Sequence, residues 1–147
     1  MAENAVFEDS GMINLVAELM LDTNSEHGMV CAAGDFCYRW LHWGDSDTKI
    51  HRRREFLTKY RVVERIRPQI ARMSRRPKAA AAVMQVVLEI VSGFATNELV
   101  ERCEMAADQG AIDLAAAVLE DTTIALTDEA APCDATLLLA YCSAGAV

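Results

Sequence analysis

Three stretches of the chain share one order of apolar and polar positions: GMINLVAELM from Gly11, RVVERIRPQI from Arg61 and GAIDLAAAVL from Gly110. In each stretch the third, sixth and tenth residues are apolar and the fourth residue is polar. Apolar residues three to four positions apart indicate an amphipathic helix. The copies begin 50 and 49 residues apart, which predicts an internal repeat built from helices.

Each copy is followed by a second apolar stretch that carries few charges, over residues 26–45, 78–97 and 132–147. Shorter stretches of mixed character, over 48–60 and 97–110, precede the second and third copies. The order predicts a unit of three helices that recurs along the chain. No stretch has the strict alternation of a half-buried strand, so the pattern does not favour a β-sheet.

Three residues bear on where these helices begin and end. Arg61 stands where the other two copies have glycine, which speaks against a tight turn at that point. Pro68 falls inside the middle copy and removes a backbone donor, so we expect it to kink or end that helix. Asn97 precedes Glu98 and is expected to cap the helix that follows.

The stretches GAIDLAAAVLED and GMINLVAELM resemble the second helix of the armadillo repeat, and VVLEIVSGFAT resembles the end of its third helix. HEAT repeats have a similar pattern, and the residues do not separate the two types. The resemblance implies an all-α, right-handed α-solenoid of about three armadillo-like repeats in one domain, residues 1–147. The repeats would cover approximately residues 1–45, 46–96 and 97–147.

In armadillo proteins the third helices line a concave groove that binds an extended peptide or a partner helix. Two groove positions are usually Trp and Asn. The resemblance places Asp35 and Glu89 at the Trp position, and Arg39 and Gly93 at the Asn position. Without the Asn residues we do not expect the usual binding of a nuclear-import signal. An acidic groove floor would suit a basic peptide or helix, although both acids would equally suit a solvated helix face.

The charges are strongly segregated. Lys49 to Lys78 contain 12 Lys or Arg and 2 acidic residues, whereas the remainder holds 2 basic and 20 acidic residues. Such a basic segment has three explanations: phosphate binding on a nucleic acid, docking of an acidic protein, or a solvated helix face. The candidate basic patch consists of Arg52, Arg53, Arg54, Arg72, Arg75 and Arg76.

The sequence offers little support for catalysis, a metal or a cofactor. His27, Cys31, Cys37 and His42 lack the paired short spacing of a structural zinc site. No glycine-rich phosphate loop or nucleophile elbow is present in the sequence. We therefore expect a protein that is not an enzyme.

Cysteine usage and hydropathy give an expected location. Five cysteines without framework spacing suggest reduced thiols in the cytoplasm or nucleus. No apolar run approaches the ~18 residues that a membrane span requires, so no membrane partner is expected.

The sequence therefore predicts a protein-binding scaffold module that acts through shape and charge. The apolar C-terminal stretch LLLAYCSAGAV is expected to pack against a second copy, another subunit or the remainder of a longer chain. Two alternatives remain open. One is a nucleic-acid-associated helical protein that uses the basic segment 49–78, and the other is a purely structural subunit of a larger complex.

Overall fold

The computed structural model describes residues 11–69, 76–93, 96–121, 124 and 130–144. Within these ranges the chain forms eight α-helices and one 3₁₀ helix, and no strand. The helices are α2 (Met12–Leu21), α3 (His27–His42), α4 (Ser46–Thr58), α5 (Val62–Ile66), η1 (Arg67–Gln69), α7 (Pro77–Ile90), α8 (Asn97–Asp108), α9 (Ala111–Glu120) and α11 (Ala130–Ala144). The prediction of an all-helical chain is confirmed.

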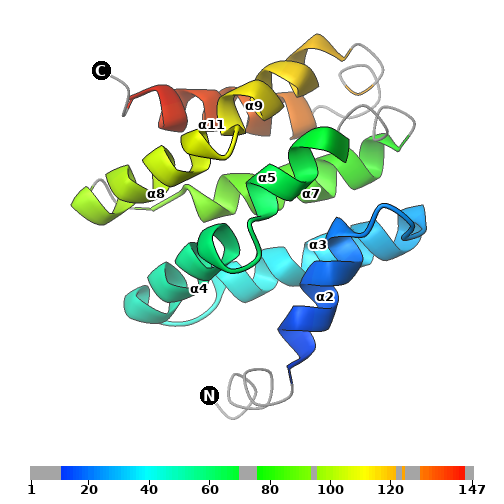
Figure 1. Cartoon of the computed structure of the whole chain (residues 1–147), viewed down its shortest axis with the longest axis horizontal. Helices are drawn as coiled ribbons and strands as arrows, with labels where there is room; N and C mark the ends of the chain where they lie inside the picture. Colours follow the sequence, from blue (N-terminus) through cyan, green and yellow to red (C-terminus); the bar gives the residue numbers. More distant parts are fainter. Residues whose placement is uncertain (1–10, 70–75, 94–95, 122–123, 125–129, 145–147) are drawn as a thin grey trace.

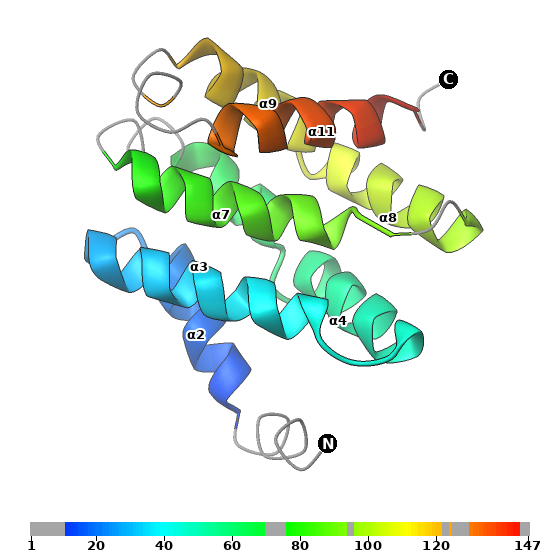
Figure 2. The same ribbon diagram turned by 180° about the vertical axis from the view of Figure 1, so that it is seen from behind.

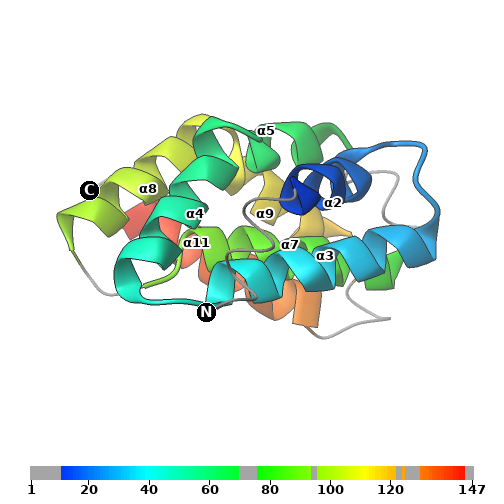
Figure 3. The same ribbon diagram turned by 90° about the horizontal axis from the view of Figure 1, so that it is seen from below.

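The helices form three successive groups (Figure 1): α2 and α3, then α4, α5 and α7, then α8, α9 and α11. The long helices α3, α7 and α11 lie side by side, with α7 between the other two (Figure 2). The helices α2 and α5 lie on one side of the row that α3, α7 and α11 form (Figure 3). Within a group, α2 packs on α3 and α9 packs on α11.

The buried apolar side chains of all eight α-helices form one cluster. Its fully enclosed members include Phe56 of α4, Met84 of α7 and Leu114 of α9. The helices α3 and α7 approach each other closely: a Cβ built on Gly34 would lie 3.1 Å from the Cβ of Ala82. The absence of a side chain at Gly34 therefore allows these two helices to approach each other closely.

The helices α2, α5 and α9, one in each group, begin in the same way. Gly11, Arg61 and Gly110 directly precede α2, α5 and α9, and all three have left-handed backbone conformations, with φ of 69°, 51° and 102°. The expectation that Arg61 would not form the tight turn was wrong. Arg61 adopts the same conformation as the two glycines, because α4 and α5 on either side of it both pack into the core.

We predict that Arg61→Gly raises the free energy of unfolding by about 0.5–1 kcal/mol. A left-handed conformation costs a residue with a Cβ roughly 1–2 kcal/mol, and glycine avoids this cost. Glycine also raises the conformational entropy of the unfolded chain, which offsets part of the stabilisation. Urea unfolding followed by circular dichroism measures the change. Arg61→Ala is the control, because it removes the exposed ion pair with Glu64 but keeps the Cβ. Equal stability of the two variants would show that the backbone is not strained.

The other two boundary predictions differ in outcome. The helix of the middle copy ends at Ile66 and continues as the 3₁₀ turn η1, which contains Pro68, so the predicted interruption is confirmed. The cap of α8 is Thr96 and not Asn97: the Thr96 hydroxyl accepts a hydrogen bond from the backbone N–H of Leu99, and Asn97 is the first helical residue.

Candidate functional site

The predicted groove residues divide between the surface and the interior. Asp35 and Arg39 lie one turn apart on α3, are both exposed, and form an ion pair of 3.2 Å. Gly93 is exposed just after α7, with φ of 142°. A Cβ on Gly93 would meet the guanidinium of Arg102 at 3.1 Å, so this glycine keeps space for a buried arginine.

Glu89 does not lie on an open groove floor. Its carboxylate accepts a hydrogen bond of 2.7 Å from Nη2 of Arg53 and lies 3.1 Å from Nδ1 of His42, and its side chain is only 13 % exposed. Contacts shared by the repeats, described next, make Gln85 and not Glu89 the counterpart of Asp35. The pairing of Asp35 with Glu89 as equivalent groove residues is therefore corrected.

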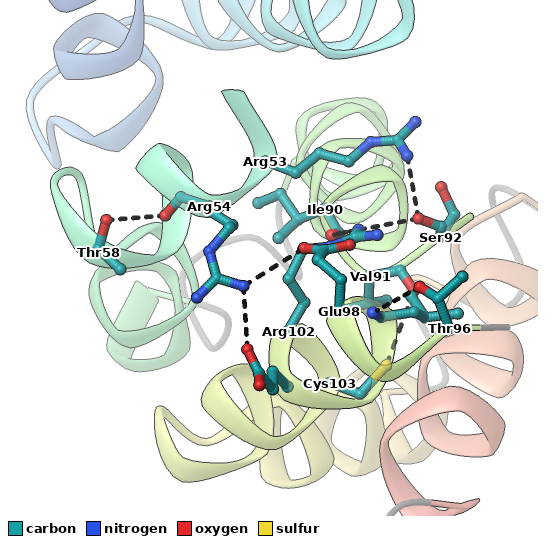
Figure 4. A network of polar contacts seen from close by, with 12 residues as sticks. Arg53, Arg54, Thr58, Ile90, Val91, Ser92, Thr96, Glu98, Arg102 and Cys103 are labelled. Atoms are coloured by element: carbon teal, nitrogen blue, oxygen red, sulfur yellow. Dashed lines mark hydrogen bonds and ion pairs between the residues drawn. The ribbon is translucent and has the colours of Figure 1, made fainter. Parts of the chain in front are cut away.

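One buried contact occurs twice at a spacing of 50 residues. Nη1 of Arg52 in α4 donates to the carbonyl oxygens of Trp40 and Trp43, at 3.0 and 3.1 Å. Nη1 of Arg102 in α8 donates to the carbonyl oxygens of Ile90 and Ser92, at 2.7 and 2.9 Å (Figure 4). Both side chains are 2 % exposed.

These contacts have the same structural role. In the middle and last groups an arginine of the first helix occupies the C-terminal end of the preceding long helix, where carbonyl oxygens lack partners within the helix. Arg52 also lies over the ring of Trp40, with its guanidinium carbon 3.7 Å from the ring centre. The contacts fix the register of the repeats, so that residue 40 corresponds to residue 90.

The other described arginines of the predicted basic patch also have partners within the chain. Arg53 bonds to Ser92 and Glu89, and the guanidinium of Arg54 contacts both Glu98 and Glu101 of α8. Arg76 donates to the backbone oxygen of Ser25. Arg72 and Arg75 lie outside the residues that the structure describes. The described arginines of the patch thus bind neighbouring helices and loops instead of forming one free basic surface.

Two further ion pairs join successive groups. Arg65 of α5 makes a two-pronged contact with the Glu18 carboxylate of α2, at 2.7 and 2.8 Å. Hydrogen bonding to Arg65 lowers the pKa of Glu18 below its usual value, and the same bond raises the pKa of Arg65. Arg67 reaches Asp113 of α9 at 3.0 Å. The sequence showed the opposite charges but not that they meet between neighbouring groups.

An open groove that the sequence did not reveal lies between α2 and the α5–η1 segment. Its volume is about 1070 Å³, and the Glu18–Arg65 ion pair forms part of its wall. Leu15, Leu19 and Pro68 provide apolar lining.

The cysteine and histidine residues considered for chemistry are scattered. Sγ of Cys31 lies 3.8 Å from Nε2 of His27, one turn away on α3, and forms no larger cluster there. Among the described residues, no three His, Cys, Asp or Glu side chains are placed to hold a metal ion together. Burial raises the pKa of Cys37 and that of Cys142 to about 12, so both thiols are protonated at neutral pH.

The described helices include none that is both long and apolar enough to cross a membrane. Comparison of the chain with protein-family models, with curated proteins and with solved structures found no match in any of the three.

Proposed function

We propose that this chain is a non-catalytic protein-interaction module, built as an armadillo-like, right-handed α-solenoid of three repeats. The recurrence of the same buried contact, from Arg52 to residue 40 and from Arg102 to residue 90, carries the proposal. Three left-handed helix starts at nearly the same spacing support it. Repeats that contact only their neighbours build extended surfaces, and proteins use such surfaces to bind other proteins.

The binding surface in this proposal is the row formed by α3, α7 and α11. Its exposed side chains include Asp35 and Arg39 on α3 and Gln85 on α7. A partner that lies across the row would meet charged and amide groups on rigid helices. The five free thiols suit a reducing compartment, and a cytoplasmic or nuclear location is part of the proposal.

A nucleic-acid role is the weaker alternative because of where the arginines lie. Phosphate binding requires cations that are free to approach the backbone of the nucleic acid. Arg52 and Arg53 are buried, and Arg54 already contacts two carboxylates. The third alternative, a purely structural subunit, predicts a stable complex that does not depend on any exposed side chain of the α3–α7–α11 row.

Affinity capture from native lysate tests the proposal, with and without nuclease and at low and moderate salt. We expect discrete proteins that survive nuclease treatment, and we expect Asp35→Arg to reduce their yield several-fold. A reversed charge in an interface places like charges together, and such a contact costs on the order of 1–3 kcal/mol. Quantitative comparison of the captured proteins gives the measurement.

The matched control is Asp47→Arg, which makes the same change of charge in the exposed first turn of α4. It should leave the yield unchanged. Loss of all captured material after nuclease treatment would make nucleic acid the ligand and overturn the proposal. Equal losses with Asp35→Arg and Asp47→Arg would show that net charge, and not the α3–α7–α11 row, controls binding.

A further inference from the structure

The charge of the chain alternates from one repeat to the next. Counting Lys and Arg against Asp and Glu, residues 1–45 carry 1 basic and 8 acidic side chains, or a net charge of −7. Residues 46–96 carry 12 and 4, or +8, and residues 97–147 carry 1 and 10, or −9. A basic middle group therefore lies between two acidic groups.

The contacts between groups follow this alternation. Arg65 of the middle group binds Glu18 of the first, and Arg67 of the middle group binds Asp113 of the last. Arg54 contacts two carboxylates of α8. At both interfaces between groups, basic residues of the middle group thus meet acidic residues of its neighbour, beside the apolar packing.

Some positions of the last group are exposed, although their described counterparts in an earlier group contact the next group. At the spacing of 50 set by Arg52 and Arg102, Glu104 of α8 corresponds to Arg54, the residue that reaches forward to the next group. Glu104 is exposed. The last group therefore has the acidic Glu104 at the position where the middle group has Arg54, the cation that contacts the next group.

The end of α9 is also exposed where its counterpart in the first group is buried. Leu119 and Glu120 are the ninth and tenth residues after Gly110. Met20 and Leu21 are the ninth and tenth residues after Gly11, so the two pairs are counterparts. Met20 and Leu21 are buried, and the backbone oxygen of Leu21 accepts a hydrogen bond from Gln69 of the middle group. Leu119 is 42 % exposed and Glu120 is also exposed.

We call Val100, Glu104, Leu119 and Glu120 the terminal face. The helices that carry it, α8 and α9, follow one another along the end of the molecule opposite α2 (Figure 1). Leu137 and Tyr141 of α11 are further exposed apolar side chains of the same group. The only Lys or Arg after residue 78 is Arg102, which is buried, so no exposed cation of this group balances its acids.

We propose that the terminal face docks a basic amphipathic helix of a partner protein. An apolar side of that helix would cover Val100 and Leu119, and flanking Lys or Arg residues would meet Glu104 and Glu120, as the middle group meets its own acidic neighbours. A second copy is a poorer occupant, because end-to-end stacking would bring a group of charge −9 against one of −7. The inference rests on the proposed function and adds a partner class and a second surface to it.

The test uses a fluorescein-labelled helical peptide of about 20 residues, which spans about 30 Å and can run along α8 and α9. Leu residues occupy one side of the peptide, and Lys and Arg the other. Fluorescence anisotropy measures its dissociation constant at low and moderate salt. Two control peptides have Glu in place of Lys and Arg, or the same composition in an order that is not amphipathic. We expect the basic amphipathic peptide to bind most tightly.

Variants of the chain then locate the binding surface. Glu104→Lys combined with Glu120→Lys should weaken binding by about tenfold or more, since each repulsive contact acts against the peptide. Leu119→Ser should weaken binding through lost apolar contact while the charge stays the same. Asp47→Lys, in the exposed first turn of α4, should leave the dissociation constant unchanged. Thermal melts confirm that each variant is folded, because all four substituted residues are exposed.

Three outcomes would overturn the inference. Equal weakening by Asp47→Lys and by the double variant would mean general attraction between a cation and an acidic protein. Equal affinity for the amphipathic and reordered peptides would mean that the apolar residues take no part. Self-association of the chain alone, reversed by Leu119→Ser in sedimentation equilibrium, would make a second copy the occupant. None of these outcomes bears on capture through the α3–α7–α11 row, so failure here is distinguishable from failure of the proposed function.

Discussion

Replacing Arg102 with methionine is expected to lower the free energy of unfolding by about 3 kcal/mol. The substitution keeps an unbranched apolar stem and removes the guanidinium. The carbonyl oxygen of Ile90 loses its arginine donor, and that of Ser92 keeps only the hydrogen bond from Arg53. The Glu98 carboxylate loses a partner at 2.7 Å. A buried polar group without a partner costs about 1–3 kcal/mol, and a partly buried carboxylate adds to that cost.

Urea unfolding followed by circular dichroism measures this change, with the slope of the transition compared between variants to check that the unfolded state is unaltered. Arg54→Met is the matched control. Arg54 also pairs with Glu98, but its side chain is partly exposed and its two contacts are 3.4 and 3.5 Å long. Its loss should cost under ~1 kcal/mol. Equal effects at Arg54 and Arg102 would show that charge, and not the bonds to the carbonyl oxygens, supports the end of α7.

The repeated pattern of apolar positions predicted the helices well because local periodicity determines them. Gly11 and Gly110 marked the starts of two helices, and Pro68 marked the end of a third. The conformation of Arg61 could not be predicted from that residue alone. An arginine disfavours the left-handed region, and only packing on both sides of the turn overcomes this preference.

The buried arginines were missed for a different reason. Within a run of cations, Arg52 is indistinguishable from residues of a solvated face, since burial depends on where the preceding long helix ends. A signal was nevertheless present. Arg102 is the only Lys or Arg in an otherwise acidic repeat, and it stands exactly one period of 50 residues after Arg52. An isolated cation that recurs at the repeat length indicates a structural role.

The error at Glu89 had a related cause. Matching short motifs allowed the long helices α3 and α7 to be aligned four residues out of register, because their apolar residues recur about every turn. The bonds from Arg52 and Arg102 remove this ambiguity, since each reaches back 12 residues to a carbonyl oxygen. Tertiary contacts of this kind determine which side chains share a surface, and the sequence pattern does not contain them.

Gly34→Val is expected to lower the free energy of unfolding by about 2–3 kcal/mol by forcing α3 and α7 apart. The Cβ alone would lie 3.1 Å from the Cβ of Ala82 and 3.4 Å from its backbone carbonyl atoms, and the two methyl groups of valine add further volume. Overpacking in a close-packed interior typically costs about 1–3 kcal/mol. The contact involves backbone atoms of α7, which cannot move aside as a flexible side chain can.

Gly28→Val in the same helix is the control, because nothing lies within 4 Å of a Cβ at that position. Both substitutions place a β-branched residue in α3, so the difference between them isolates the contact with α7. Ala82→Gly in the Gly34→Val background should recover part of the loss, and a double-mutant cycle measures the coupling. Equal destabilisation by the two valines, together with zero coupling to Ala82, would mean that α3 and α7 do not approach each other closely at Gly34.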